Sequence, residues 1–241
     1  MSSNQQRTLG VALYALGILL IIALAATAVV GDMEASLFDA AIRAEETLRS
    51  MRCPVLITRD EVGQVSARFE NTGQRPVERA IRVHISQGFV TLFREEDVKL
   101  PLQPGERQRL AWEVTVDDAA FGSSLILARI STLRQAPMPS QSNACGIFVV
   151  DLPWISGALA TAAWLGLGLL GIGAGGWLWL RASRPLTGRR RSAGNAMLAV
   201  AITTLGALAA GLAGIWVFGV VLLAILVLLL IALASQAILD S

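Results

Sequence analysis

Few side chains in this chain belong to the types that usually carry chemistry. The chain has a single histidine, His84, and two cysteines, Cys53 and Cys145. Zinc and iron–sulfur sites take several such ligands, so the sequence predicts no metal site, and we expect no cofactor. His84 lies between Val83 and Ile85 in an alternating stretch, which predicts a solvated side chain that points away from the core. With only one histidine, a Ser-His-Asp hydrolase is not expected, and we expect no enzyme.

Two further patterns suggest chemistry that their sequence context does not support. Residues 166–171 read Gly-Leu-Gly-Leu-Leu-Gly, which matches G-x-G-x-x-G, but they lie in an apolar stretch with no strand before them. The acidic runs 95–97 and 117–118 lack the loop pattern of a calcium site. We therefore predict close helix packing for the first pattern and charged turns for the others. Whether a pigment, quinone or lipid binds between the helices stays open.

The two cysteines bracket the charged middle of the chain. Cys53 precedes the first alternating stretch and Cys145 precedes the last one. In an oxidising compartment they are expected to form a disulfide, which contributes about 4 kcal/mol to stability on the chain-entropy model. Two free thiols with a redox role are the alternative, although the chain has no Cys-x-x-Cys motif.

The composition indicates a membrane protein. Of the 241 residues, 54% are hydrophobic and 16% are charged, against roughly 45–50% and about 25% in soluble domains. A membrane-spanning helix needs about 20 residues, and four apolar stretches have this length: residues 9–30, 153–180, 195–214 and 215–239. We interpret the first as an uncleaved anchor because a signal peptide has only about 7–15 apolar residues; cleavage near Ala26-Thr27-Ala28 is the alternative.

Basic residues predict how these helices are oriented. Cytoplasmic loops are enriched in Lys and Arg, and the loop 181–194 contains arginines but no acidic residue. We therefore expect this loop, the tail 1–8 and the C-terminus on the cytoplasmic side of the plasma membrane, and the segment 31–153 on the extracytoplasmic side. The arginines are also expected to contact lipid headgroups, and no nucleic acid is expected as a partner. The arginines are Arg181, Arg184, Arg189, Arg190 and Arg191.

Small residues repeat at helical spacing in two of the predicted spans. Such small-xxx-small faces allow helix backbones to approach closely in lipid. We expect these faces to pack within one four-helix bundle, and association with another subunit is the alternative. The residues are Gly171 and Gly175 in the second span, and Gly206, Ala207, Ala210, Gly211 and Gly214 in the third.

The segment between the first two spans changes its period along its length. In residues 31–52 apolar residues recur at steps of three and four, which predicts a helical stalk; a short coiled coil between two copies is the alternative. In residues 53–152 apolar and polar residues alternate, most clearly at 65–70, 81–86 and 109–116, with turn residues between these stretches. Several short strands at this spacing predict an antiparallel β-sandwich.

One part of this segment resembles a known family. Phe69-Glu70-Asn71-Thr72-Gly73 is followed by Leu100-Pro101-Leu102-Gln103-Pro104-Gly105-Glu106 and then by Leu110-Ala111-Trp112-Glu113-Val114. A strand ending in N-x-G, then a P-G-E turn and another strand, is similar to the Ig-like CARDB modules of bacterial surface proteins. The resemblance extends over residues 65–116. It implies a sandwich fold and a binding or spacer role, without enzymatic activity.

Together these patterns predict a multi-pass α-helical membrane protein with four transmembrane helices and an extracytoplasmic, all-β, Ig-like sandwich. The expected function is that of a non-catalytic structural or interaction protein that presents the sandwich outside the membrane. The alternative is an accessory subunit of a larger respiratory, photosynthetic or transport complex, bound through its helices. The expected partners are membrane lipids and other membrane or envelope proteins, or further copies of the chain.

Overall fold

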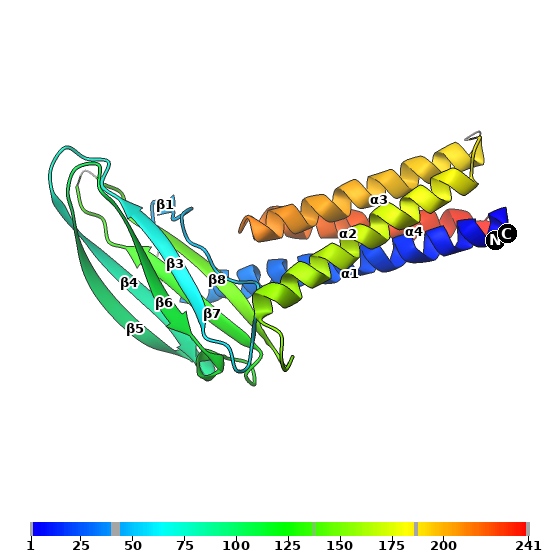
Figure 1. Ribbon diagram of the computed structural model, residues 1–241. Helices are drawn as coiled ribbons and strands as arrows, with labels where there is room; N and C mark the ends of the chain where they lie inside the picture. Colours follow the sequence, from blue (N-terminus) through cyan, green and yellow to red (C-terminus); the bar gives the residue numbers. More distant parts are fainter. Residues whose placement is uncertain (1, 40–43, 137, 186–187, 240–241) are drawn as a thin grey trace. The chain divides into compact units, whose positions relative to one another are not determined.

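The computed structural model describes residues 2–39, 44–136, 138–185 and 188–239. The chain forms two compact units. We call Val30–Ala160 the head, and Met1–Val29 with Thr161–Ser241 the helical unit. Figure 1 shows that strands dominate the head and that long helices make up the helical unit.

The helical unit draws on four helices that lack a polar face, as bilayer helices do. One of its buried clusters includes Tyr14, Ile18, Val200 and Leu226. The indole N–H of Trp164 donates to the carbonyl of Leu20 at 2.9 Å, so this polar group is paired within the helical unit. The helices are α1 (Ser3–Leu37), α2 (Gly157–Ala182), α3 (Arg189–Leu212) and α4 (Trp216–Leu239).

Three of these helices, α1, α2 and α3, are long and apolar enough to cross a membrane, and the prediction of four spans is wrong for the described residues. Gly214 adopts a left-handed conformation with φ +72°, and α4 begins only at Trp216. The described apolar stretch of α4, Trp216–Ala232, is shorter than a span. At ~1.5 Å per residue it covers about 25 Å of a hydrocarbon core that is ~30 Å thick.

The head contains a six-stranded sheet and a two-stranded sheet. The larger has the order β1-β8-β7-β4-β5, with β2 also paired to β8, and the smaller consists of β3 and β6. The elements are β1 (Glu46–Thr47), β2 (Leu56–Thr58), β3 (Gly63–Glu70), β4 (Val77–Gln87), β5 (Phe89–Leu102), β6 (Arg107–Val114), the 3₁₀ helix η1 (Val116–Asp118), β7 (Leu125–Thr132) and β8 (Gln141–Val150).

Alternation along the strands determines which side chains fill the core of the head. Val65 of β3 and Val83 and Ile85 of β4 are fully buried in one cluster with residues from both sheets. Trp112 of β6 adds the largest ring to this cluster. Side chains on one face of a strand recur every second residue, so each strand contributes a row of apolar groups to the core.

The head differs from the predicted all-antiparallel sandwich, because β1 and β2 both run parallel to β8. Alternation reveals a strand but not the direction of its neighbour, and these two strands are only two and three residues long. The acidic run 95–97, predicted as a turn, lies inside the 14-residue strand β5. The second acidic run, 117–118, lies in η1.

The predicted helical stalk over 31–52 is also wrong beyond its first two turns. The helix ends at Leu37, and Asp39 adopts a left-handed conformation with φ +49°. Phe38 is buried against Leu125 and Leu127 of β7, so packing on the sheet ends the helical period. Leu48 and Met51, expected on the same helical stripe, belong instead to the core of the head. Residues 40–43 of the predicted stalk lie outside the described residues.

Candidate functional site

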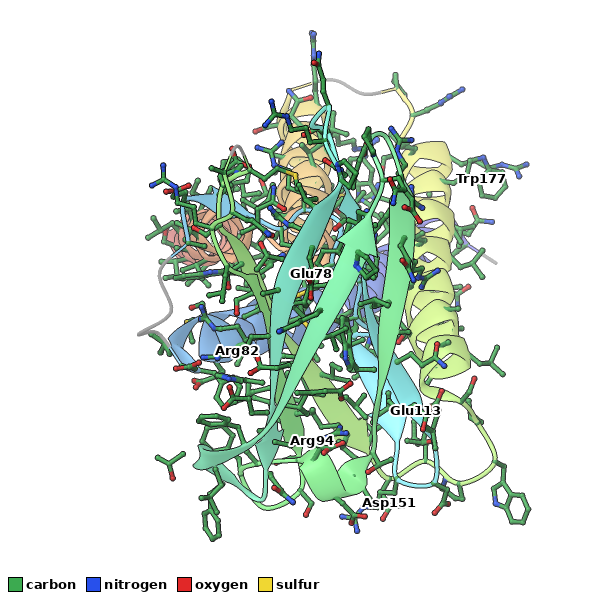
Figure 2. The ribbon with its side chains drawn as sticks, turned by 90° about the vertical axis from the view of Figure 1, so that its left-hand side faces the viewer. Glu78, Arg82, Arg94, Glu113, Asp151 and Trp177 are labelled. Atoms are coloured by element: carbon green, nitrogen blue, oxygen red, sulfur yellow. A yellow bond between two sulfur atoms is a disulfide. The ribbon has the colours of Figure 1, made fainter. Side chains whose placement is uncertain are left out.

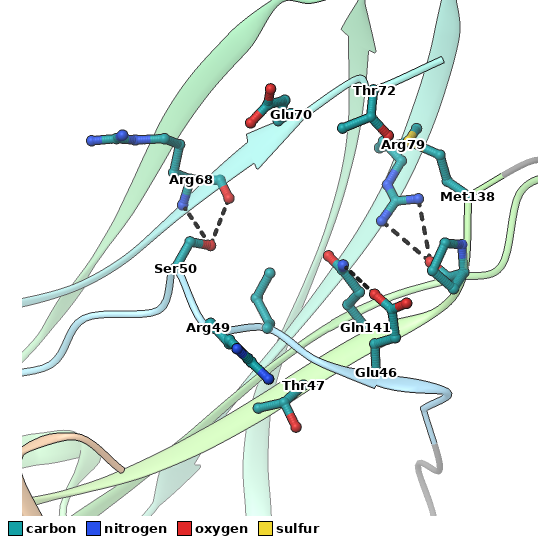
Figure 3. Close-up of a pocket in the computed structure, with 12 residues that line it drawn as sticks. Glu46, Thr47, Arg49, Ser50, Arg68, Glu70, Thr72, Arg79, Met138 and Gln141 are labelled. Carbon is teal, nitrogen blue, oxygen red and sulfur yellow. Dashed lines mark hydrogen bonds between the residues drawn. The ribbon is translucent and has the colours of Figure 1, made fainter.

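A groove of about 740 Å³ runs along one side of the head, and we call it the arginine groove. The segment that contains β1, one end of β3, and the chain leading into β8 form its borders (Figure 3). Its volume lies within the range of about 300–1,000 Å³ that is typical of ligand sites. Its charged and polar lining residues are Glu46, Thr47, Arg49, Ser50, Arg68, Glu70, Thr72, Arg79 and Gln141.

Arg79 supplies a rigid positive charge to the groove. It lies on β4, and only 3% of its surface is exposed. Its guanidinium donates to the carbonyl of Pro139 at 3.4 Å and to the hydroxyl of Thr132 at 3.0 Å. Burial lowers the pKa of Arg79, and the nearby charge of Glu46 partly opposes this effect. The side chain stays charged at neutral pH because the ordinary pKa of an arginine lies far above neutrality.

Two further arginines of the groove are exposed and carry uncompensated charge. Arg49 and Arg68 form no ion pair with any residue that the structure describes. Ser50 fixes the position of Arg68, since its hydroxyl donates to the Arg68 carbonyl at 2.6 Å and accepts from the Arg68 N–H at 3.3 Å. The arrangement can therefore attract an anion without first breaking an internal salt bridge.

The two carboxylates of the groove already have partners. Glu70 forms an ion pair with Arg107 at 2.9 Å. Glu46 accepts a hydrogen bond from the side chain of Gln141 at 3.0 Å. Three arginines thus line the groove against two carboxylates, of which Glu70 is already paired with Arg107, so the net charge of the groove is positive and favours an acidic ligand. Sequence analysis missed this site because its residues come from separate segments, and only the fold brings them together.

The single histidine is buried, contrary to the solvated position predicted for it. His84 does point away from the core that contains Val83 and Ile85, but the chain after α1 covers it. Its Nδ1 lies 2.6 Å from Oδ2 of Asp39, and its ring stacks on Phe93 with centroids 4.3 Å apart. The buried polar face of the sheet therefore holds the end of α1 in place.

His84 has the contacts of a structural group. Its Nε2 lies 3.7 Å from a carboxylate oxygen of Glu95, which is too long for a hydrogen bond. Nearby, Arg129 donates to the carbonyls of Phe38 and Ser36 at 2.8 and 2.9 Å. Burial lowers the pKa of Arg129, and the charge of Asp39 raises it. The cluster ties the residues after α1 to the sheet rather than presenting a reactive atom.

The predicted disulfide is confirmed. Cys53 and Cys145 are bonded, with their Cα atoms 6.6 Å apart. Cys145 pairs with Ala128 within the larger sheet, so the bond ties β8 to the segment that precedes β2. The bond closes the head as a covalent loop that contains most of its strands.

The small residues predicted to pack lie at different kinds of contact. A Cβ added to Gly171 would lie 2.8 Å from Cα of Gly17, and one added to Gly175 would lie 2.3 Å from the backbone nitrogen of Tyr14, so α1 and α2 touch at backbone distance. On α3, Gly211 faces Ala28 of α1. The remaining predicted residues comprise Gly206, which faces Leu222, the buried Ala207 and Ala210, and Gly214, which lies in the turn after α3.

The predicted arginines lie around the connection from α2 to α3. Arg181 lies over the ring of Trp177, 5.4 Å from its centroid, in a cation–π contact. Arg184, Arg190 and Arg191 are exposed. Arg189 begins α3, and its side chain lies outside the described part of the chain.

Comparisons with known proteins give structural neighbours of part of the chain but no family. No protein-family model matches the chain, and no curated protein matches it. Among solved structures, a CARDB domain from Pyrococcus furiosus is similar over 42% of this chain and 84% of its own, at 13% identity and a TM-score of 0.31. A Paenibacillus cycloisomaltooligosaccharide glucanotransferase is similar at 10% identity and a TM-score of 0.33, over 46% of this chain.

A β-glucosidase from Listeria innocua matches 42% of this chain at 15% identity and a TM-score of 0.29. This chain covers only 15% of the glucanotransferase and 16% of the β-glucosidase. The structural neighbours thus include a CARDB domain, the type of module that residues 65–116 resemble. At these scores the neighbours provide no argument about activity.

Proposed function

We propose that this protein is a non-catalytic, membrane-anchored interaction protein. Its apolar helices anchor it, and its head binds an acidic peptide segment of another membrane or envelope protein in the arginine groove. The observation that carries this proposal is the charge of the groove: buried Arg79 is fixed, while Arg49 and Arg68 are exposed and unpaired within the described residues. An acidic segment would bind there through charge-assisted hydrogen bonds.

We further propose that the head is extracytoplasmic and that the loop 181–194 lies on the cytoplasmic side of the plasma membrane. Two features support this arrangement. The arginines of the loop follow the rule that cytoplasmic loops are basic. The Cys53–Cys145 disulfide of the head suits an oxidising compartment. Protease digestion of sealed vesicles tests the proposal, and digestion of both parts from one side would contradict it.

A direct binding experiment tests the groove. The full chain in lipid nanodiscs is titrated with a fluorescent peptide that alternates Glu and Ser. We expect binding that weakens with added salt, because exposed charges are screened. The double variant Arg49→Glu and Arg68→Glu should weaken binding by about tenfold or more, as expected when close attractive charge pairs become repulsive.

Arg75→Glu is the matched control for this experiment. Arg75 is exposed like Arg49 and Arg68, but it does not line the groove. Its reversal changes the net charge of the head by the same amount per residue. The single variants Arg49→Glu and Arg68→Glu are each compared with this control. Equal loss of binding in the control and in either of them would refute a specific site, and so would an absence of binding to the unaltered chain.

A second candidate function, an accessory subunit of a larger membrane complex, is supported by α2. Gly166 and Gly173 lie seven residues apart on this helix, and a Cβ added at either would meet no atom within 4 Å. Such a face allows another helix to approach closely. Mild detergent extraction from native membranes followed by mass measurement tests this candidate, and a lone chain of 25.6 kDa would contradict it.

A further inference from the structure

Five large apolar side chains are exposed in three connecting regions of the head, which we call its loops: the tip of the β4–β5 hairpin with the start of β5, the turn after η1, and the chain between β8 and α2. Phe89 is 69% exposed, Phe121 51% and Trp154 99%. Leu92 and Ile155 are 55% and 42% exposed in the same loops. We call these five residues the apolar rim. Single exposed apolar residues are ordinary, whereas a group of them marks a contact surface.

Hydrogen bonds hold the first two loops together. Ser86, at the end of β4, donates its hydroxyl to the carbonyl of Asp118 in η1 at 2.6 Å. Arg94 of β5 lies 3.2 Å from the carboxylate of the same aspartate. The β4–β5 hairpin that carries Phe89 is therefore fixed to η1, and Phe121 follows η1 by three residues.

The third loop lies at the same end of the head. Val149 of β8 donates its N–H to the carbonyl of Ser124 at 2.9 Å, so the turn that begins at Phe121 lies beside the end of β8. The chain leaves β8 at Val150 and reaches Trp154 four residues later. In Figure 2, Asp151 lies at this end of the strands.

The backbone of the rim is strained at two of its three exposed rings. Phe121 has φ +50° and Trp154 has φ +78°. Bulky residues rarely adopt this left-handed conformation, which usually persists where a contact or a function offsets its cost. A ring that is both strained and exposed is unfavourable in water. Both features are expected if the rings enter an apolar medium.

We propose that the apolar rim inserts into the interfacial region of the lipid bilayer that anchors the chain. Continuity of the chain supports a lipid occupant: Trp154 lies three residues before Gly157, the first residue of α2, which is long and apolar enough to cross a membrane. Tryptophan is enriched where helices enter a bilayer. The proposal rests on membrane anchoring but not on the arginine groove.

The rim has the chemistry of non-specific lipid insertion rather than of headgroup binding. Its five residues are apolar, and the charges around it are of both signs: Asp151 lies 3.8 Å from Arg59, and Asp118 lies 3.2 Å from Arg94. Arginines that are paired with acids in this way do not form a selective site for anionic headgroups. Insertion is therefore expected in uncharged phosphatidylcholine bilayers, where apolar area alone drives it.

Fluorescent labels on the full chain in phosphatidylcholine proteoliposomes test the proposal. The only two cysteines of the chain are bonded to each other, so each of the variants Phe89→Cys, Phe121→Cys and Gln74→Cys has one free thiol for the environment-sensitive dye NBD. Gln74 is the matched control, because it is exposed in the connection to the start of β4, at the other end of that strand from the rim.

We expect the dyes at positions 89 and 121 to emit at shorter wavelength than the dye at position 74. A lipid with a spin label near its headgroup should quench these two dyes about twofold more than the control, since interfacial insertion reaches ~5–10 Å into the bilayer. Circular dichroism and an intact disulfide by mass establish that each labelled chain is folded.

Two results would overturn the proposal. Water-like emission at positions 89 and 121 would mean that the rim stays in solvent. Short-wavelength emission without quenching by the lipid would mean that protein covers the rim, either a second copy or a part of the same chain. Failure of the peptide to bind the arginine groove leaves both results unchanged, so the two proposals fail independently.

Discussion

The head packs around a large apolar core, whereas α1 and α2 of the helical unit meet at glycines. The core of the head consists of large side chains such as Trp112, Ile126 and Phe69. In the helical unit, α1 and α2 meet at glycines, where an added Cβ would collide with backbone. A Cβ added to Gly17, for example, would lie 2.5 Å from the backbone nitrogen of Ile172. Water drives large apolar groups together, whereas lipid gives no such force and rewards close backbone contact.

The two units also differ in the hydrogen-bond partners of their buried polar side chains. The head buries Arg79, His84 and Arg129, each with a polar partner from another element. In the helical unit the Thr204 hydroxyl, also buried, donates to the carbonyl of Val200 one turn earlier in its own helix. The buried charged groups of the head thus depend on contacts between distant segments, whereas the helical unit uses both bonds within a helix, as at Thr204, and bonds between helices, as from Trp164 to Leu20. This comparison orders the following predictions.

Removal of the disulfide should have the largest effect, and only on the head. The variant Cys53→Ala with Cys145→Ala should lose about 4 kcal/mol of unfolding free energy, because the bond closes a loop with a sequence separation of 92 residues. Hydrogen exchange measured peptide by peptide in detergent reports both units at once. Peptides of α3 serve as the internal control. Equal loss of protection in α3 would show that the two units unfold together.

Overfilling a glycine contact should break the helical unit and spare the head. At Gly175 a Cβ would lie 2.3 Å from the backbone of Tyr14, so Gly175→Leu should cost about 3 kcal/mol or separate α1 from α2. Cysteine cross-linking between the two helices, in the Cys53→Ala and Cys145→Ala background, measures this separation.

Gly173→Leu is the matched control, two residues away on the same helix. A Cβ at Gly173 meets no atom within 4 Å, so this variant should keep the α1–α2 contact. Similar loss of cross-linking in both variants would contradict the assignment of the contact face to Gly175.

The sequence predicted the pieces of each unit better than their arrangement. Alternation located the strands that contain Val65, Val83 and Leu110, and the cysteine positions predicted their bond. These predictions were correct because a strand follows from the local period of apolar residues, and the disulfide follows from the presence of only two cysteines. The fourth span was wrong because the described apolar stretch of α4 extends only over Trp216–Ala232, although the helix begins within one residue of the predicted start.

The features that the sequence did not reveal depend on long-range contacts. The helical period of the sequence continues past Phe38, but the helix ends there because the Phe38 ring packs on Leu125 and Leu127 of β7. His84 has the pattern of a solvated residue until Asp39 covers it from 45 positions away. The arginine groove combines residues 46–50, 68–72, 79 and 138–141, and no local signal links these segments.

Breaking the polar cover of His84 should have an intermediate effect, limited to the head. Asp39→Ala removes the acceptor 2.6 Å from His84 Nδ1, and an unpaired buried group costs about 1–3 kcal/mol. Hydrogen exchange should show faster opening of Ser36–Phe38. Asp97→Ala is the control, because Asp97 pairs with the exposed Arg82 and should change stability by less than ~1 kcal/mol. If both variants lowered the unfolding free energy equally, the buried pair of Asp39 and His84 would be no more important to the head than the exposed pair of Asp97 and Arg82.

Neutralising the exposed arginines of the groove should have the smallest effect on stability. Arg49→Ser and Arg68→Ser each remove a charge that has no ion-pair partner among the described residues, so the unfolding free energy should change by about 0.5 kcal/mol or less. Arg79→Met is the contrasting variant, since it removes a buried donor to the Pro139 carbonyl and to the Thr132 hydroxyl, and it should cost about 1–3 kcal/mol. Denaturant titration of the full chain in detergent measures all three. If Arg49→Ser and Arg68→Ser lowered the unfolding free energy as much as Arg79→Met, the two exposed arginines would have a structural role. The proposal of an acidic ligand would then lose its main support.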